Sequence, residues 1–437
     1  MESGLRILLL NPPGRKIYLR DLYCPTVSKT RYLWPPGDLF VQSGILAEKH
    51  LPMVLDAIAE NLSPRQTLQK IANARPDLIL FVTSSISWEE DRKILQTIKN
   101  EFNPLLFGSG DILQFSGPDI MRENSFLDGI ILDLLSDSIP RFLEKTPARI
   151  SNLIYRTNGE IILGPRIRES SAFTTPIGKY ELFPIDRYSL PFGKRGRWGF
   201  SYTSYGCPHN CQFCPIPDMG FRLRELDNIV LELQHLKSLR IRNLFFRDSS
   251  LTNAPAHTLK LLERIHQSRL GFNWICHSRA DTVNRSLLQA MKTAGCSLIT
   301  FGIESGDPEL RKKYKITMSD AEIMSGFALC RDLGIKTLAH FIIGLPGENP
   351  ETLQRTSTLA RKLNCDFASF NLFEPRSQPV RSEVGSPAGQ FRRAKNKLTR
   401  KFYLRPGYLW SQLVQARSPG EIFRQALHGL RLLVTRG

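Results

Sequence analysis

The stretch Cys207-Pro-His-Asn-Cys211-Gln-Phe-Cys214 decides how the rest of the chain is interpreted. It places three thiols in one short loop, directly after an extended aromatic run at residues 198–205. Soft sulfur ligands select zinc, copper(I) or an iron–sulfur cluster. A structural zinc site takes four ligands, usually as two separated pairs, and no second Cys/His pair follows here. Three thiolates on a four-iron cluster would leave one iron open to bind something else. The alternatives are a zinc knuckle or a reduced surface loop.

From residue 198 onward the sequence alternates strand and helix patterns, which predicts a parallel α/β sheet. Six such units are fewer than the eight that close a barrel, so we expect a partial (β/α)6 barrel over 197–376, with its functional residues at the carboxyl ends of the strands. The predicted strands are Trp198–Ser204, Asn243–Arg247, Asn273–His277, Leu298–Ile303, Thr337–Ile343 and Phe367–Leu372. The predicted helices are Arg222–Leu239, Pro255–Ser268, Asn284–Thr293, Ser319–Leu333 and Pro350–Leu363.

Residues 1–150 show the same alternation and predict a separate domain, a doubly wound, Rossmann-like parallel sheet that would bind ligands at its carboxyl edge. Its predicted strands are Leu5–Leu10, Pro52–Leu55, Leu78–Val82, Leu105–Phe107 and Gly129–Leu132. Its predicted helices are Asp38–His50, Pro64–Ala74, Trp88–Glu101 and Leu135–Glu144. In the connecting segment 151–196, Asn158-Gly159 between two β-prone runs predicts a hairpin with a type I′ turn, followed by a linker.

Size and composition favour a cytoplasmic protein of two to three domains. The chain has 437 residues, of which 41% are hydrophobic and 23% charged, and these values are ordinary for a globular protein. No run approaches the eighteen apolar residues of a membrane span. The other five cysteines, Cys24, Cys276, Cys296, Cys330 and Cys365, are scattered along the chain. We expect them to be small buried hydrophobic residues, so the sequence predicts a single cluster.

The net charge of +18 is concentrated near the end of the chain. Residues 381–437 hold twelve Lys and Arg against two Glu, and we expect 377–437 to form a basic helical extension. Residues 421–434 place Phe423, Leu427, Leu430 and Val434 on one helical face. Such a helix packs on its own barrel, lies on an anionic membrane or follows phosphates.

The spacing Cys-x3-Cys-x2-Cys after the first barrel strand, with Phe213 before the third cysteine, resembles the signature of the radical S-adenosylmethionine (SAM) superfamily. The resemblance implies that Cys207, Cys211 and Cys214 ligate a 4Fe-4S cluster and are the catalytic residues. It further implies that the open iron chelates SAM. The reduced cluster would pass an electron to the sulfonium, and the resulting 5′-deoxyadenosyl radical would abstract hydrogen from a substrate.

The resemblance also assigns cofactor-binding roles at the strand ends. Asp248 follows the second predicted strand and would hold the methionyl amine of SAM, although an Asp that caps the next helix is as common. Arg279 follows the third strand and would capture a carboxylate of SAM or substrate, unless it pairs with Asp281.

Two further elements resemble family motifs. Gly302-Ile-Glu304-Ser305-Gly306 would hold the ribose or the amine through Glu304, with Ser305 close to the nucleoside. Gly344-Leu-Pro346-Gly-Glu348 would flank the adenine. His340, which precedes that turn, is interpreted as a core residue and is left out of the site.

The first domain resembles the cobalamin-binding domain that precedes many radical SAM domains, with Asn11-Pro12-Pro13 and Trp34-Pro35-Pro36-Gly37 at its edge. It departs from that family in three ways. It lacks an Asp-x-His-x-x-Gly element, it has Gly108-Ser-Gly110 followed by Asp111, and it has Leu132-Asp-Leu-Leu-Ser-Asp137 in place of a glycine-rich loop. Cobalamin binding therefore stays open.

The segment Lys401-Phe-Tyr-Leu-Arg405-Pro resembles the subgroup of anaerobic magnesium-protoporphyrin ester cyclases and hopanoid methylases. This implies C-methylation or oxidative cyclisation of a small apolar intermediate, of the lipid or tetrapyrrole class. Expected partners are an electron donor such as flavodoxin or ferredoxin and, through the basic extension, the inner face of a membrane. Nucleic acid is disfavoured, because methylthiotransferases for tRNA carry three further N-terminal cysteines. The alternatives are an RNA- or protein-modifying radical SAM enzyme and a cluster protein without catalysis.

Overall fold

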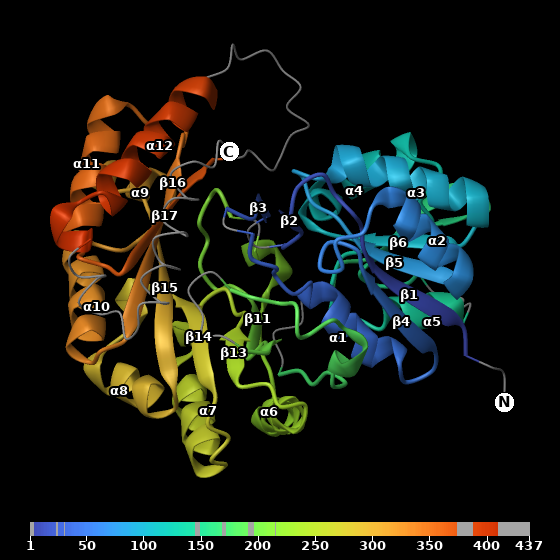
Figure 1. The fold of residues 1–437 in the computed structure, drawn as a ribbon, viewed down its shortest axis with the longest axis horizontal. Coiled ribbons are helices and arrows are strands. Elements are labelled where there is room, and N and C mark those ends of the chain that lie inside the picture. Colours follow the sequence, from blue (N-terminus) through green and yellow to red (C-terminus); the bar gives the residue numbers. More distant parts are fainter. Residues whose placement is uncertain are drawn as a thin grey trace. The chain divides into compact units, whose positions relative to one another are not determined.

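The hydrophobic strand β1 (Arg6–Asn11) lies inside a seven-stranded sheet with the order β4-β1-β5-β6-β7-β8-β9 (Figure 1). The computed structural model describes residues 4–22, 25–29, 31–144, 149–167, 172–190, 196–214, 216–373 and 388–409. The parallel strands β4, β1, β5 and β6 stand in continuous register. The strand bounds are β4 (Leu51–Asp56), β5 (Leu78–Val82), β6 (Leu105–Ser109) and β7 (Gly129–Ile131). The expected doubly wound parallel sheet is therefore confirmed.

The helices that connect the strands of the first sheet begin at residues with local capping signals. Ser63 and Gln66 make a reciprocal capping box at the start of α2, with Pro64 in the first turn, so the predicted bounds of this helix are those observed. One helix between β6 and β7 was not predicted, because Pro118 lies inside it. The helix bounds are α1 (Gly37–Leu46), α2 (Pro64–Ala74), α3 (Trp88–Phe102), α4 (Asp111–Glu123) and α5 (Ser138–Leu143).

The predicted hairpin is confirmed as β8 (Leu153–Thr157) and β9 (Glu160–Leu163). Asn158 and Gly159 have φ values of 49° and 82°, as a type I′ turn requires at both central positions. The hairpin is more than a connection, because β8 pairs antiparallel with β7 and adds two strands to the first sheet. The short strands β2 (Tyr18–Leu19) and β3 (Thr26–Val27) form a separate ribbon.

The second sheet has the order β10-β13-β14-β15-β16-β17 and confirms the six-strand partial barrel. The pairs from β14 to β17 are parallel. Its strands are β10 (Trp198–Ser201), β13 (Asn243–Phe246), β14 (Asn273–Ser278), β15 (Cys296–Glu304), β16 (Lys336–Ile343) and β17 (Phe367–Leu372). Its helices are α6 (Leu226–Ser238), α7 (Pro255–Gln267), α8 (Arg285–Thr293), α9 (Pro308–Lys313), α10 (Asp320–Asp332), α11 (Pro350–Lys362) and α12 (Ala388–Tyr403).

Two local predictions in this region were wrong. The first predicted strand ends at Ser201, and Ser204–Gly206 forms a separate strand, β11, paired with β12 (Phe221–Leu223). Residues 222–225 are therefore not helical, and α6 begins at Leu226. The short helix α9 was also missed, although Asp307 caps it and Pro308 opens it.

The helix α12 protects the open edge of the second sheet. The Tyr403 hydroxyl donates to the carbonyl of Ala368 on the edge strand β17 (2.8 Å) and accepts from its N–H (3.1 Å). Leu398 and Phe402 are buried beside it. An uncovered edge strand would expose pairing groups, so the described part of the basic extension has a structural role. The predicted helix at 421–434 lies outside the described residues.

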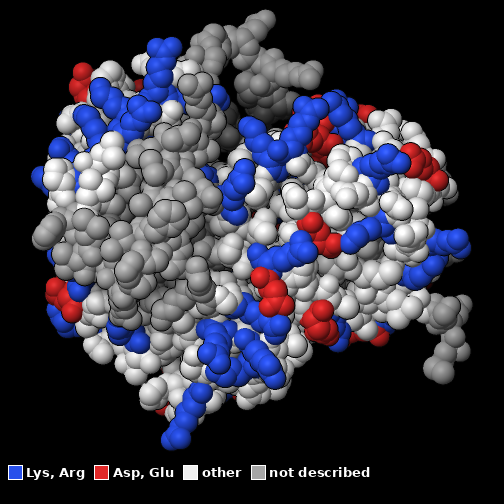
Figure 2. Space-filling model, in the orientation of Figure 1, with Lys and Arg blue, Asp and Glu red and all other residues white. Residues whose placement is uncertain are grey.

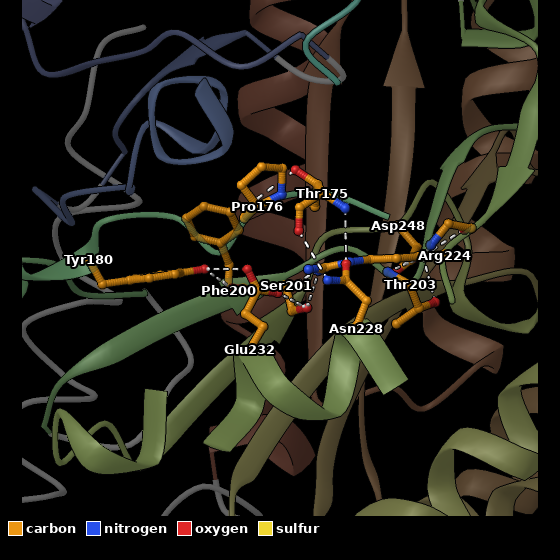
Figure 3. Close-up of polar contacts among 11 residues, drawn as sticks. Thr175, Pro176, Tyr180, Phe200, Ser201, Thr203, Arg224, Asn228, Glu232 and Asp248 are labelled. Atoms are coloured by element: carbon orange, nitrogen blue, oxygen red, sulfur yellow. Dashed lines mark hydrogen bonds and ion pairs between the residues drawn. The ribbon is translucent and has the colours of Figure 1, made fainter. Parts of the chain in front are cut away.

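By its contacts the chain divides into two compact units, centred on Met1–Ser201 with Met219–Asn243, and on Tyr202–Asp218 with Leu244–Pro375. A buried ion pair stabilises the first unit, with Arg224 Nη1 2.6 Å from Glu232 Oε2 (Figure 3). The Ser201 hydroxyl donates to the same carboxylate (2.5 Å), and Asn228 Oδ1 accepts from Arg224 Nε (2.7 Å). These hydrogen bonds offset the desolvation of two charges that would otherwise be costly to bury.

Candidate active site

The cysteine loop begins at Cys207, directly after β11. Cys207, Cys211 and Cys214 are partly exposed, whereas Cys276, Cys296, Cys330 and Cys365 are buried, and none of these seven cysteines forms a disulfide. The expectation that these four are small core residues is confirmed, and Cys24 lies outside the described residues. The three loop cysteines are thus the accessible thiols of the described chain.

The turn before this loop is held by Asp248, which follows β13. Its Oδ1 accepts from the Thr203 hydroxyl (2.8 Å) and N–H (3.1 Å) (Figure 3). The same oxygen accepts from the Ser204 hydroxyl (2.6 Å) and from the Ser204 N–H. The side chain has 0% exposure. Burial raises the pKa of Asp248, and these hydrogen bonds oppose the rise. In this geometry the carboxylate supports the turn before the loop, and its role as partner of the SAM amine stays a prediction.

Arg279 follows β14, and its guanidinium is already engaged. Its Nε and Nη2 donate to the two carboxylate oxygens of Asp281 (2.9 and 2.6 Å), which is the alternative that the sequence left open. The same side chain acts on the cysteine loop. Burial raises the pKa of the Cys211 thiol, and the cation of Arg279 opposes that rise. Arg279 therefore favours a thiolate at Cys211, while capture of a ligand carboxylate would require the Asp281 pair to open.

Glu304 ends β15 in an uncommon backbone conformation. Its φ is 66°, and the pairing register with β16 shifts between Gly302 and Glu304. A Cβ on Gly302 would lie 2.6 Å from Glu304 Oε1, so the missing side chain there leaves room for the carboxylate. Glu304 is half-buried. Burial raises its pKa to about 7, and Arg279 acts in the opposite direction. A carboxyl at this pKa changes charge near neutral pH.

Ser305 is turned inward, unlike Glu304. It has 0% exposure, and its Oγ accepts from the N–H of Asp307 (3.1 Å) while its carbonyl accepts from Arg311 (2.8 Å). Its side chain therefore stabilises the turn into α9 and does not reach the surface. The contact of Ser305 with a nucleoside stays a prediction.

The turn at residues 344–348, which follows β16, is stabilised by hydrogen bonds. Gly344 has φ 96°, and its N–H donates to Glu348. The exposed Pro346 accepts from Tyr314 Oη through its carbonyl (2.8 Å), and the Tyr314 ring meets Phe213 edge-on at 6.4 Å. Phe213 and Pro346 are thus linked through one tyrosine. Whether Gly344 and Pro346 flank an adenine stays a prediction.

The sheet carries a polar row that the sequence interpretation missed. His340 is half-exposed and lies 6.1 Å from His277 between ring centroids, so it was wrongly assigned to the core. His277 Nδ1 also pairs with the Thr300 hydroxyl. Ser369 stands beside His340 in register on β17. His277 pairs in register with Thr300, and Thr300 with Leu338, two residues before His340. Residues two apart on a strand point to the same face of the sheet, and this alternation was the available signal.

No group of three His, Cys, Asp or Glu side chains among the described residues is arranged to hold a single metal ion. Zinc needs its ligands to converge on one centre. In a cubane each thiolate binds a different iron, so the cysteines stand apart around the cluster. Three partly exposed thiols in one loop fit this arrangement of cluster ligands.

The carboxyl edge of the first sheet is where a corrinoid would be expected to bind. Gly110 has φ 141°, and a Cβ there would lie 2.0 Å from the carbonyl oxygen of Thr83. The absence of a side chain at Gly110 therefore allows close packing against the backbone of Thr83. In the loop 132–137, Leu134 is buried and its carbonyl accepts from Gln42 Nε2 (2.6 Å). Neither loop offers a backbone cradle lined by glycine, so these residues fit a closely approaching corrin poorly.

Residues 201–360 match the family model described as the radical SAM superfamily. The chain is 27% identical over 387 residues to an uncharacterized methyltransferase of Pyrococcus horikoshii, covering 85% of this chain and 81% of that protein. It is 25% identical over 375 residues to the anaerobic magnesium-protoporphyrin IX monomethyl ester cyclase of Rubrivivax gelatinosus, covering 78% of this chain and 64% of the cyclase.

Two solved structures share the fold. The radical SAM methyltransferase TsrM from Kitasatospora setae, with cobalamin and a 4Fe-4S cluster bound, matches with TM-score 0.68 at 19% identity over 86% of this chain and 74% of its own. The cobalamin-dependent SAM radical enzyme OxsB matches with TM-score 0.63 at 15% identity over 84% and 53%. At these identities the likeness concerns the fold alone. Residues 201–360 therefore match the radical SAM superfamily, and the cysteine loop lies near the start of this matched segment.

Proposed function

We propose that the chain is a radical SAM enzyme whose cysteines Cys207, Cys211 and Cys214 bind one 4Fe-4S cluster. The observation that carries the proposal is the set of three partly exposed thiols near the start of the segment that matches the radical SAM superfamily, while the other described cysteines are buried. When bound and reduced, the cluster supplies the electron for reductive cleavage of SAM. That electron must come from a donor, and we propose a flavodoxin or ferredoxin.

The chain's own residues have distinct tasks in this proposal. Asp248 holds the turn that precedes the loop. Arg279 favours the thiolate of Cys211 through its charge. Among the three carboxyl groups at these strand ends, Glu304 is the one we propose to bind the amine of SAM. It is partly exposed, whereas Asp248 is fully buried and Asp281 is paired with Arg279.

The proposal is tested on protein reconstituted under anaerobic conditions with iron and sulfide. We expect about four irons per chain, a reduced-cluster EPR signal, and 5′-deoxyadenosine from SAM after reduction with dithionite. Stoichiometric zinc with no bound iron would refute the cluster. A cluster protein without catalysis would show the iron and the EPR signal but release no deoxyadenosine.

Glu304→Gln should weaken SAM binding with little change in melting temperature, because the amide keeps the shape and loses the charge. A hydrogen bond to a charged partner contributes about 1.5–3 kcal/mol, so we expect the Kd for SAM to rise by roughly tenfold or more. The pKa of Glu304 is about 7, so its carboxylate fraction grows as pH rises. In the parent protein SAM should therefore bind more tightly at pH 7.5 than at pH 6, while the variant stays flat. Equilibrium dialysis at both pH values measures this, and an equal pH slope in the variant would assign the amine to another group.

For the substrate we propose a small, largely apolar intermediate of the lipid or tetrapyrrole class that undergoes C-methylation or oxidative cyclisation. The sequence similarity to the cyclase supports this class, although the chain spans 64% of that protein.

We further propose that the basic extension contacts anionic membranes. In the described part of the chain no helix is both long and apolar enough to cross a bilayer. The exposed cations Arg392, Arg393, Lys397, Arg400 and Lys401 lie along α12 (Figure 2), whose sequence has no acidic residue.

Substitution of Arg392, Arg393 and Lys397 by Glu should abolish flotation with phosphatidylserine-containing liposomes. In the parent protein flotation should weaken as salt screens the charges. A matched control replaces Lys336, Arg361 and Lys362, which are exposed elsewhere in the same domain, and it should float like the parent. Equal loss in both variants would mean that net charge, not α12, governs binding, and tighter binding to RNA than to liposomes would favour a nucleic-acid partner.

Cobalamin is proposed as a second cofactor on the strength of the shared fold alone. Because the edge loops lack a glycine-lined cradle, we expect any corrinoid to bind in a mode that does not need close backbone approach after β6. Cobalt content and the visible spectrum after expression with hydroxocobalamin measure this directly. Active SAM cleavage with no bound cobalt would argue against corrinoid-dependent methylation as the reaction and would favour oxidation or cyclisation.

A further inference from the structure

Asn253 closes the short 3₁₀ helix Leu251–Asn253 that follows β13. Its side-chain amide contacts two members of the cysteine loop. The Nδ2 atom lies 3.8 Å from the sulfur of Cys207, within reach for a hydrogen bond to sulfur, and the Oδ1 atom lies 3.1 Å from Nε2 of His209. Asn253 is half-buried, so solvent competes only in part for these bonds.

The two contacts select one orientation of the amide. The Oδ1 atom only accepts hydrogen bonds, so Nε2 of His209 must carry the hydrogen that it shares with Asn253. The amide N–H then points to Cys207. In the reverse orientation the amide oxygen would face the sulfur, and two acceptors would repel once the sulfur is a thiolate. His209 therefore holds the donor of Asn253 toward Cys207.

A hydrogen bond to a ligand sulfur matters for redox chemistry, since such bonds help to set the reduction potential of an iron–sulfur cluster. The donor stabilises negative charge on the sulfur, and that charge increases when the cluster is reduced. We propose that Asn253 is a positioning residue that raises the reduction potential of the cluster through its N–H···S bond to Cys207, with His209 orienting the amide. This inference rests on the proposed function, because it requires the cluster on Cys207.

Two variants separate the bond to sulfur from the bond to histidine. Asn253→Asp keeps an oxygen that accepts from His209 but replaces the donor with a negative carboxylate. Asn253→Leu has similar volume and removes both contacts. We expect the midpoint potential to become more negative in Asn253→Leu and still more negative in Asn253→Asp. Potentiometric titration of the reconstituted full-length protein, followed by the EPR signal of the reduced cluster, measures both without any turnover.

Ser249→Ala is the matched control for loosening of the loop. The Ser249 hydroxyl donates to the carbonyl of Gly206 (2.6 Å), the residue before Cys207. It makes no hydrogen bond to a sulfur atom of the described residues. Its loss should lower thermal stability and leave the potential near that of the parent.

Each outcome bears on one proposal. No cluster in the parent protein would refute the proposed function itself. A parent cluster with unchanged potentials in both Asn253 variants would overturn this inference alone, and so would an equal shift in Ser249→Ala. Failure of both Asn253 variants to assemble a cluster, while Ser249→Ala assembles one, would show that Asn253 is needed for cluster binding, which also overturns the tuning role.

Discussion

The Cys211→Ala protein should bind no 4Fe-4S cluster and release no 5′-deoxyadenosine, because loss of one of three thiolates leaves one more iron without a protein ligand. Cys211 lies in the middle of the loop and is partly exposed, so removal of its sulfur should cost little packing energy. Iron and sulfide analysis, the EPR signal and chromatography of deoxyadenosine measure the effect. We expect activity at the level of a reaction without protein.

Cys365→Ala is the matched control, since it removes a buried thiol outside the loop. It should keep the iron content and SAM cleavage of the parent, with at most a modest loss of stability from the missing sulfur. Wild-type iron in Cys211→Ala, or its loss in Cys365→Ala, would contradict the assignment of the ligands.

The second large effect concerns Asp248, for which we expect loss of stability as the primary defect. Asp248→Ala would leave the N–H and hydroxyl groups of Thr203 and Ser204 without their common acceptor inside the protein. Unsatisfied buried donors cost about 1–3 kcal/mol each before relaxation, so the variant should melt well below the parent. Asp248→Asn keeps one acceptor oxygen and should be affected less.

Comparison with Glu304→Gln distinguishes a structural role of Asp248 from a role in SAM binding. If Asp248 supports the loop, its alanine variant should lose melting temperature and cluster content together, whereas Glu304→Gln should lose mainly SAM affinity. Differential scanning fluorimetry under anaerobic conditions and SAM binding measure the two properties separately. An Asp248→Ala protein with the parent's melting temperature and a raised Kd for SAM would instead support the SAM-binding role predicted from the sequence.

Much of the fold was predictable because short sequence patterns indicate where individual strands, helices and turns form. Strands β5 and β17 and helix α2 have the predicted bounds, since buried hydrophobic runs and capping boxes are local signals. The hairpin followed from Asn158-Gly159, whose residues tolerate positive φ. The failures have physical causes too. Helix α4 forms around Pro118, because packing against the first sheet outweighs the propensity penalty.

The amino-acid sequence by itself determined the cysteine loop, the two α/β sheets and the buried state of the scattered described cysteines, because spacing and periodicity are properties of neighbouring residues. Only the tertiary structure decided which strand-end side chains face outward. Asp248 turns inward to Thr203 and Ser204, Glu304 stays accessible beyond a register shift, and Asn253 reaches Cys207 across 46 positions. Such contacts depend on how separate strands end beside each other, and a linear pattern contains no information on that geometry.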